Sequence, residues 1–92
     1  MELKFFFKQG CPYCKCANEV IAELFSEHPE YAKLPLERID EENPPDLHGK
    51  KYDYWYVPTF FLNDKKMYEA QPGDDAPKMK KILGNIFAQM AK

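Results

Sequence analysis

The sequence predicts a single α/β layer domain over residues 1–92, in the order strand, helix, strand, short helix, two strands and final helix. Three observations support this class. Short β-favouring runs alternate with stretches whose apolar residues recur at helical spacing. A helix of about 15 residues between two short strands is typical of a right-handed βαβ unit. The 92 residues, 45% of them hydrophobic, suffice for one core. We therefore expect a central four-stranded mixed sheet flanked by about three helices.

The βαβ unit is expected to come first. Leu3–Phe7 is a β-favouring run, and Leu36–Asp40 is the second. Pro12 suits the first position of the intervening helix, because the N–H that it lacks would have no partner there, so Cys11 becomes the N-cap. The helix is expected to close at residues 28–29, a His-Pro pair. Its apolar stripe consists of Cys14, Ala17, Val20, Ile21, Leu24 and Phe25.

The second half is expected to begin with a short helix, capped by Asn43 and limited by Gly49 to roughly two turns. Residues 58–62 and 66–69 are expected to form two strands of a hairpin, joined by a tight turn. A final helix follows, with an apolar stripe at Met79, Ile82, Leu83, Ile86, Phe87 and Met90.

The charge of the chain argues against two classes of partner. Thirteen basic and fifteen acidic residues give a net charge of −2, which provides no electrostatic footprint for nucleic acid or anionic lipid. The apolar run at residues 5–7 is far too short for a signal peptide or a membrane span. We therefore expect a cytoplasmic protein that binds neither nucleic acid nor membrane.

All three cysteines lie within residues 11–16, too close together to staple distant loops of a secreted domain. Cys11 and Cys14 are three residues apart at a helix start, which places both sulfurs on one edge of the helix. The N-cap thiol faces backbone N–H groups and the positive end of the helix dipole, and both favour the thiolate that attacks disulfides. Cys14, on the apolar stripe, is expected to be less exposed. One cysteine attacks and the other resolves.

Two other interpretations of these thiols stay open. A pair spaced like Cys11 and Cys14 also occurs in zinc sites, although those sites usually have a second pair of ligands, whereas here only His28 and His48 are present. Cys16 lies about 200° around the helix from Cys14, so it is expected to be a half-buried packing residue. As an alternative, it supplies a third soft ligand or a redox-sensitive side thiol.

Three further motifs have a plain structural interpretation and a functional one. Lys8, three residues before Cys11, is a surface lysine or a cation near the helix N-terminus. Val57-Pro58 opens a strand; a trans bond is the commoner case, and a cis bond would leave the Val57 backbone able to pair with an extended peptide. Asp74 or Asp75 caps the last helix, and the pair instead or in addition helps to hold a charged ligand.

These residues and their order resemble the glutaredoxins of the thioredoxin superfamily over essentially the whole chain. The resemblance rests on the dithiol motif at residues 11–14, Lys8 before it, the Val57-Pro58 pair before a hairpin, and the aspartate pair opening the final helix. It implies a thioredoxin-like fold, a cis bond at Pro58, and Cys11 as the thiol that accepts glutathione.

The resemblance also implies roles in binding glutathione. Lys8 would meet its glycine carboxylate, the Val57 backbone would pair with its cysteinyl unit, and Tyr13 would line the groove. Asp74 and Asp75 would hold its γ-glutamyl end. Glutathione would be a co-substrate, with no tightly bound cofactor or metal, and the partners would be disulfide-containing or glutathionylated proteins. The chain is expected to act as a monomer.

The sequence departs from the family pattern at three places. Tyr56 stands where the family usually has Thr, and residues 71–73 (Gln-Pro-Gly) replace the usual pair of glycines. Residues 43–56 lack the usual pattern of the family's second helix, and Lys50 or Lys51 is a speculative substitute cation there.

We therefore expect a thiol-disulfide oxidoreductase, with Cys11 as nucleophile and Cys14 as resolving thiol. One alternative is a thioredoxin-like dithiol electron donor that ignores glutathione. Another is a metal or iron–sulfur binding module that uses Cys11, Cys14 and Cys16. A third is a binding domain without catalysis.

Overall fold

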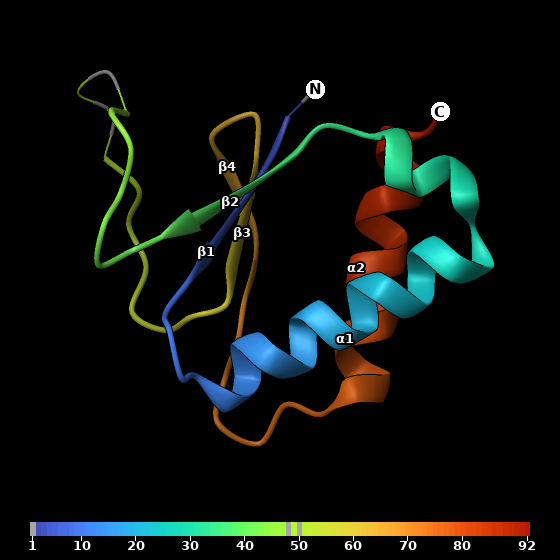
Figure 1. Ribbon diagram of the computed structural model, residues 1–92, viewed down its shortest axis with the longest axis horizontal. Coiled ribbons are helices and arrows are strands. Elements are labelled where there is room, and N and C mark those ends of the chain that lie inside the picture. The colour runs from blue at the N-terminus through green and yellow to red at the C-terminus, as the bar shows by residue number, and fades with distance from the viewer. Residues whose placement is uncertain (1, 48, 50) are drawn as a thin grey trace.

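A mixed four-stranded sheet organises the computed structural model, which describes residues 2–47, 49 and 51–92 (Figure 1). The strands are β1 (Leu3–Phe7), β2 (Leu36–Asp40), β3 (Thr59–Leu62) and β4 (Lys65–Glu69). They lie in the order β2-β1-β3-β4, with β1 and β2 parallel and the other two pairings antiparallel. The βαβ unit and the hairpin expected from the sequence are therefore confirmed.

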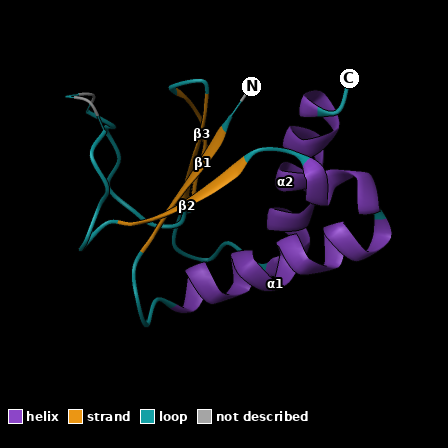
Figure 2. Ribbon diagram, turned by 45° about the horizontal axis from the view of Figure 1, so that its top comes forward, coloured by secondary structure: helices purple, strands orange, loops and turns teal. Residues whose placement is uncertain are grey.

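Two helices cover one face of the sheet (Figure 2). They are α1 (Pro12–Glu27) and α2 (Ala76–Met90), and a short 3₁₀ helix, η1 (Pro29–Lys33), follows α1. Both predicted stripes face this core, where the ring of Phe5 stacks on that of Phe60 at a centroid distance of 4.5 Å. The buried stripe residues are Cys14, Ala17, Val20, Ile21 and Leu24 of α1, and Met79, Leu83, Ile86, Phe87 and Met90 of α2.

The described residues of the segment between β2 and β3 cover the opposite face of the sheet and form no helix. Its Tyr52 and Tyr54 pack on Phe6 and Phe61, with Ile39 completing the buried cluster. In Figure 1 this segment, green to yellow, lies on the side of the sheet away from α1 and α2.

The short helix predicted to begin at Asn43 is wrong for the described residues 43–47 and 49; residues 48 and 50 lie outside the described part. The chain instead turns directly after β2, where the Asn43 N–H donates to the Asp40 carbonyl at 3.1 Å. Two consecutive prolines at residues 44–45 supply no N–H, and Gly49 has φ +77°, so too few helical residues remain between them. The α/β class with its mixed sheet is unaffected.

The hairpin turn between β3 and β4 has the local geometry that its sequence favours. Asn63 and Asp64 have φ values of 50° and 69°, as in the two-residue turns whose twist matches paired strands. Within the part of the chain that the structure describes, no helix has the length and apolar character needed to cross a membrane.

Candidate active site

Cys11 occupies the N-cap of α1, at the end of the loop that follows β1. Its backbone is extended, and its Sγ accepts a hydrogen bond from the Cys14 N–H at 3.3 Å. The thiol also donates to the Val57 carbonyl oxygen at 3.7 Å, which joins the start of α1 to the loop before β3. The Val57 carbonyl partners the protonated sulfur, whereas the Cys14 N–H and the helix dipole stabilise a thiolate. The half-buried sulfur thus has one hydrogen-bond donor and one hydrogen-bond acceptor within reach.

Cys14 lies one turn further along α1, and only 3% of it is exposed. Burial, followed by the hydrogen-bonded neighbour Cys11, raises the pKa of its thiol to about 12, against a lowering contribution from the Lys8 backbone. Cys14 is therefore a thiol at neutral pH. The predicted difference between an accessible Cys11 and a sheltered Cys14 is confirmed by their exposure.

The Val57–Pro58 peptide bond is cis, as the resemblance implied and against the expectation from spacing alone. Pro58 and Thr59 are buried at the start of β3, and the Thr59 hydroxyl donates to the carbonyl of Tyr56. Tyr56 itself is 49% exposed beside this loop. The loop thus brings one backbone carbonyl to Cys11 while leaving an aromatic side chain at the rim.

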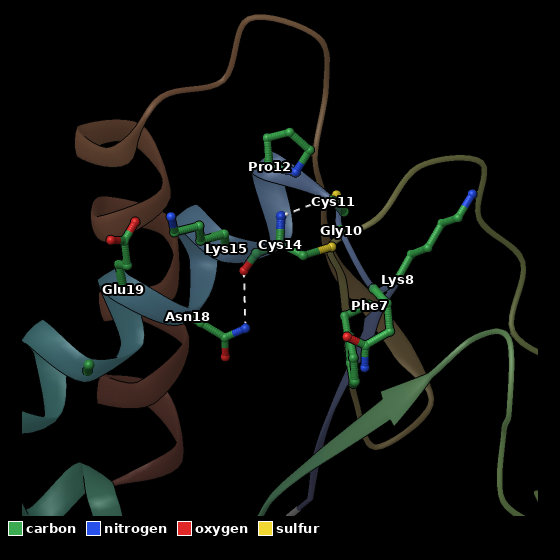
Figure 3. A pocket seen from close by; sticks show the side chains of 11 residues that line it. Phe7, Lys8, Gly10, Cys11, Pro12, Cys14, Lys15, Asn18 and Glu19 are labelled. Carbon is green, nitrogen blue, oxygen red and sulfur yellow. Dashed lines mark hydrogen bonds between the residues drawn. The ribbon is translucent and has the colours of Figure 1, made fainter.

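A pocket of about 730 Å³ opens beside the two cysteines, between the end of β1 and one face of α1 (Figure 3). Phe7, Asn18 and Ala22 line it together with both cysteines. Of the residues predicted to bind glutathione, only Lys8 joins this lining. Figure 3 shows the Lys8 side chain extending away from Cys11 and Cys14. The pocket therefore flanks the cysteines on a different side from the loop that carries Val57.

Tyr13 connects the dithiol motif to the turn before α2. Its hydroxyl oxygen accepts a hydrogen bond from the Gly73 N–H at 2.9 Å. Gly73 has φ +93°, a conformation that residues with a Cβ rarely adopt, so the glycine allows the turn to present this N–H. The start of α1, the loop of Val57 and the turn before α2 are thus joined around Cys11.

The two aspartates at the start of α2 have different environments. Asp75 is the N-cap, and its Oδ1 accepts from the Lys78 N–H at 3.0 Å. Asp74 is 8% exposed, and its carboxylate accepts from Lys78 Nζ at 2.7 Å, the Tyr68 hydroxyl at 2.6 Å and the Gln71 N–H at 3.0 Å. These three donors, led by Lys78, lower the pKa of Asp74 to about 2. Capping by Asp75 is confirmed, whereas the Asp74 side chain is engaged inside the protein.

Cys16 is half-buried and packs against the core on the helical side of the sheet. Burial is the main cause that raises the pKa of its thiol, and the negative charges of Glu19 and Asp75 raise it as well. Among the described residues, no group of three or more His, Cys, Asp or Glu side chains is arranged to hold a metal ion. The packing interpretation of Cys16 is thus supported by its contacts.

Sequence reasoning missed Glu69, whose side chain supports the loop before Val57. Its Oε2 accepts from the N–H groups of both Trp55 and Tyr56, at 2.6 and 2.8 Å. It lies on β4 directly opposite Thr59. No local pattern signals such a contact, because it depends on the register between β3 and β4. The sequence predicted the hairpin of β3 and β4, but not the register that places Glu69 opposite Thr59.

Comparisons with known proteins show which family the chain resembles. The sequence model of the family described as Glutaredoxin-like domain (DUF836) matches residues 2–84. The chain is 34% identical over 77 residues to Glutaredoxin-3 of Mus musculus, and to the same degree to Glutaredoxin-3 of Homo sapiens. In each case the match covers 83% of this chain and 22% of the relative, so the chain spans about a fifth of the length of these relatives.

A solved structure supports the fold. The periplasmic thioredoxin SoxS from Paracoccus pantotrophus, in its reduced form, superposes with a TM-score of 0.52 at 23% sequence identity. The superposition covers 92% of this chain and 97% of the thioredoxin. The thioredoxin-like α/β fold is therefore confirmed.

Proposed function

The chain belongs to the glutaredoxin-like family, whose type of function is thiol-disulfide oxidoreduction, and on this premise we propose that it reduces glutathione mixed disulfides and protein disulfides. Cys11 is the nucleophile and Cys14 the resolving thiol. The observation that carries the proposal is the position of Cys11, at a helix N-cap with the Cys14 N–H 3.3 Å from its Sγ.

The proposed reaction transfers electrons between sulfurs only. The Cys11 thiolate attacks the glutathionyl sulfur of a mixed disulfide, so a new S–S bond forms on Cys11 and the substrate leaves as a thiolate that takes a proton from water. A second glutathione thiolate then attacks the enzyme-bound glutathionyl sulfur, which forms glutathione disulfide and releases Cys11. Alternatively, the Cys14 thiolate attacks Cys11 Sγ, which breaks the bond to the glutathionyl sulfur, releases glutathione as a thiolate that takes a proton from water, and closes an internal disulfide. Two electrons from an external dithiol or from two glutathione molecules reopen that disulfide.

The surroundings suggest how glutathione would be held. We assign its cysteinyl unit to the Val57 backbone, since that carbonyl already contacts the Cys11 thiol. Its γ-glutamyl end would meet Asp75 and the backbone near the start of α2, because both oxygens of Asp74 are already bonded within the protein. Lys8 and Tyr13 remain predicted contacts. A dithiol that glutathione keeps reduced suits a reducing compartment, so we propose a cytoplasmic enzyme. We also propose that it is monomeric and has no tightly bound cofactor.

Turnover of a glutathionylated peptide tests the proposal, with glutathione as reductant and glutathione reductase recycling it. We expect Cys11→Ser to abolish turnover and Cys14→Ser to keep most of it, because glutathione alone resolves the glutathionylated Cys11. Cys16→Ser is the matched control, since this half-buried thiol lies outside the pair, and we expect it to match wild type.

Loss of turnover in both Cys11→Ser and Cys14→Ser would contradict the glutathione-resolved route. It would favour the thioredoxin-like donor, which needs both thiols and a separate reductant. No turnover by wild-type protein would contradict the use of glutathione altogether.

A further inference from the structure

The large hydrophobic side chains that are exposed in the described part of the chain belong to two segments that meet at Cys11, the dithiol motif and the loop before β3. They are Tyr13, Trp55 and Tyr56, at 36%, 88% and 49% exposure. Tyr13 belongs to the dithiol motif, and Tyr56 adjoins Val57, whose carbonyl lies 3.7 Å from Cys11 Sγ. The Cα of Trp55 is within about 8 Å of that of Val57, because consecutive Cα atoms are 3.8 Å apart. The exposed rings are thus carried by the two segments that the Cys11–Val57 contact joins.

The backbone beneath Trp55 and Tyr56 is firmly held, so a loose loop does not explain their exposure. One oxygen of Glu69 accepts from both N–H groups, at 2.6 and 2.8 Å, and its other oxygen pairs with Lys66 at 2.8 Å. The Glu69 side chain is only 11% exposed. Lys66 Nζ also donates to the Asp53 carbonyl at 3.1 Å, which fixes the residues that precede Trp55.

The negative charge of Glu69 strengthens its hydrogen bonds with the N–H groups of Trp55 and Tyr56. Burial by itself would raise the pKa of the carboxyl, but the Lys66 ammonium and the two backbone N–H groups outweigh it and lower the pKa. Hydrogen bonds to an ionised carboxylate are stronger than those between neutral groups. The Tyr56 carbonyl is held as well, by the buried Thr59 hydroxyl. The two rings are therefore displayed on a preorganised backbone, a condition that lowers the entropic cost of binding.

We infer that Trp55 and Tyr56, displayed by the positioning residue Glu69, form with Tyr13 an aromatic docking surface for a disulfide-bearing polypeptide whose residues next to the reacting cysteine are apolar. The inference rests on the proposed function and names the substrate class of the same site. Glutathione carries no apolar side chain beyond its cysteine, so it has no apolar group to pack on Trp55 and Tyr56. Exposed Trp and Tyr side chains are the residue types that most often dominate binding to polypeptides.

The test compares two glutathionylated peptides of equal length and charge. One carries Leu and Phe beside its cysteine and the other carries Ser and Gly, while the mixed disulfide of glutathione and 2-mercaptoethanol serves as a small substrate. We expect wild type to favour the apolar peptide about tenfold in kcat/KM, a difference typical of one well-packed anchor side chain. We expect Trp55→Ala to reduce this preference severalfold more than it reduces turnover of the small substrate.

Two substitutions test the positioning role of Glu69. Glu69→Ala is expected to lower the preference as Trp55→Ala does, whereas Glu69→Gln restores part of it, because the amide oxygen still accepts from both N–H groups. Glu37→Ala is the matched control: Glu37 pairs with Lys4 at 3.1 Å on the edge strand β2. We expect this control to keep the wild-type preference.

A binding measurement separates this inference from the proposed function. Trp55 is the single tryptophan of the chain, so its emission reports the surface directly. In the Cys11→Ser variant, the apolar peptide is expected to shift this emission to the blue, and the Ser/Gly peptide is not. Equal binding and equal turnover of both peptides, with the small substrate still reduced, would overturn the docking surface alone. Failure to reduce any of the three substrates would overturn the proposed function, and the emission shift would still decide the docking surface.

Discussion

In the proposed route through two thiols, the burial of one side chain, Cys14, limits the rate. Burial is the main reason that its pKa lies near 12, and the hydrogen bond with Cys11 is the second. At pH 7 a thiol with that pKa is ionised in about one molecule in 10⁵. When Cys11 is held in a mixed disulfide its charge is gone, but Cys14 stays as buried as before. Resolution by Cys14 is therefore limited by formation of its thiolate.

This balance predicts a strong pH dependence for closure of the internal disulfide. With Cys11 glutathionylated beforehand and no free glutathione present, we expect the rate of closure to rise about tenfold per pH unit between pH 7 and 9, because the thiolate fraction rises by that factor below the pKa. Release of glutathione, followed by mass spectrometry after acid quenching, measures the rate. Cys16→Ser controls for closure by the third thiol, and a rate independent of pH would show that burial does not control Cys14.

The positions of both cysteines could be predicted from the sequence because they follow from the spacing in one helix. The N-cap and a residue three later on the apolar stripe are visible in the spacing of residues 11–14 alone. Asp74 could not be resolved in this way. Its partners Tyr68 and Lys78 come from β4 and α2, and only the folded turn between them shows that its carboxylate points inward.

At the scale of elements, residues 52–55, in the segment that covers the second face of the sheet, alternate between half-buried and exposed side chains. Tyr52 and Tyr54 lie against Phe6, at ring-centroid distances of 5.1 and 5.2 Å, whereas Asp53 and Trp55 are exposed. The Tyr54 hydroxyl donates to Glu41 at 3.0 Å. The segment behaves as a half-buried extended chain, which has a period of two residues.

Substitutions along this segment should reproduce the alternation. We expect Tyr54→Ala to lower the free energy of unfolding by about 2–3 kcal/mol, because its half-buried ring leaves a gap beside Phe6. Trp55→Ala should change it by less than about 0.5 kcal/mol. Tyr54→Phe, which keeps the ring and loses only the bond to Glu41, should cost about 1 kcal/mol. Urea unfolding followed by circular dichroism measures all three, and a larger loss for Trp55→Ala than for Tyr54→Ala would contradict the alternation.

The elements that could be predicted share a strong local pattern. Both long helices and the hairpin carry periodic apolar residues or a turn pair such as Asn63 and Asp64. The short helix expected after Asn43 had only a capping residue and a glycine in its favour. Phe6 and Phe61 are apolar side chains on the second face of the sheet, and they are buried by the alternating tyrosines Tyr52 and Tyr54 of an extended chain. Tertiary packing, which no local window contains, therefore decided the structure of this segment.

At the scale of the whole molecule, the pH dependence of stability follows from which charged groups are buried. Asp74 and Glu69 have pKa values below those of the unfolded chain, mainly because Lys78 and Lys66 donate to them against the effect of burial. A group with a lowered pKa in the folded state adds stability above its unfolded pKa and loses it as the pH falls through the folded value. For Asp74 that window runs from its usual 3.8 down to about 2.

We therefore expect the free energy of unfolding to be level from about pH 5 to 8 and to fall between about pH 4 and 2, with Asp74 contributing about 1–2 kcal/mol of the loss. Urea unfolding at each pH measures this profile.

Asp74→Asn combined with Glu69→Gln should be less stable than wild type at pH 7 and nearly independent of pH between 5 and 2, because neither site then titrates. Lys80→Ala removes ion pairs with Glu23 and Glu27 that lie at the surface, so its profile should keep the wild-type shape. If the double variant lost stability with acid as steeply as wild type, carboxylates other than these two would control the acid response, and the start of α2 would not be held by the charge of Asp74.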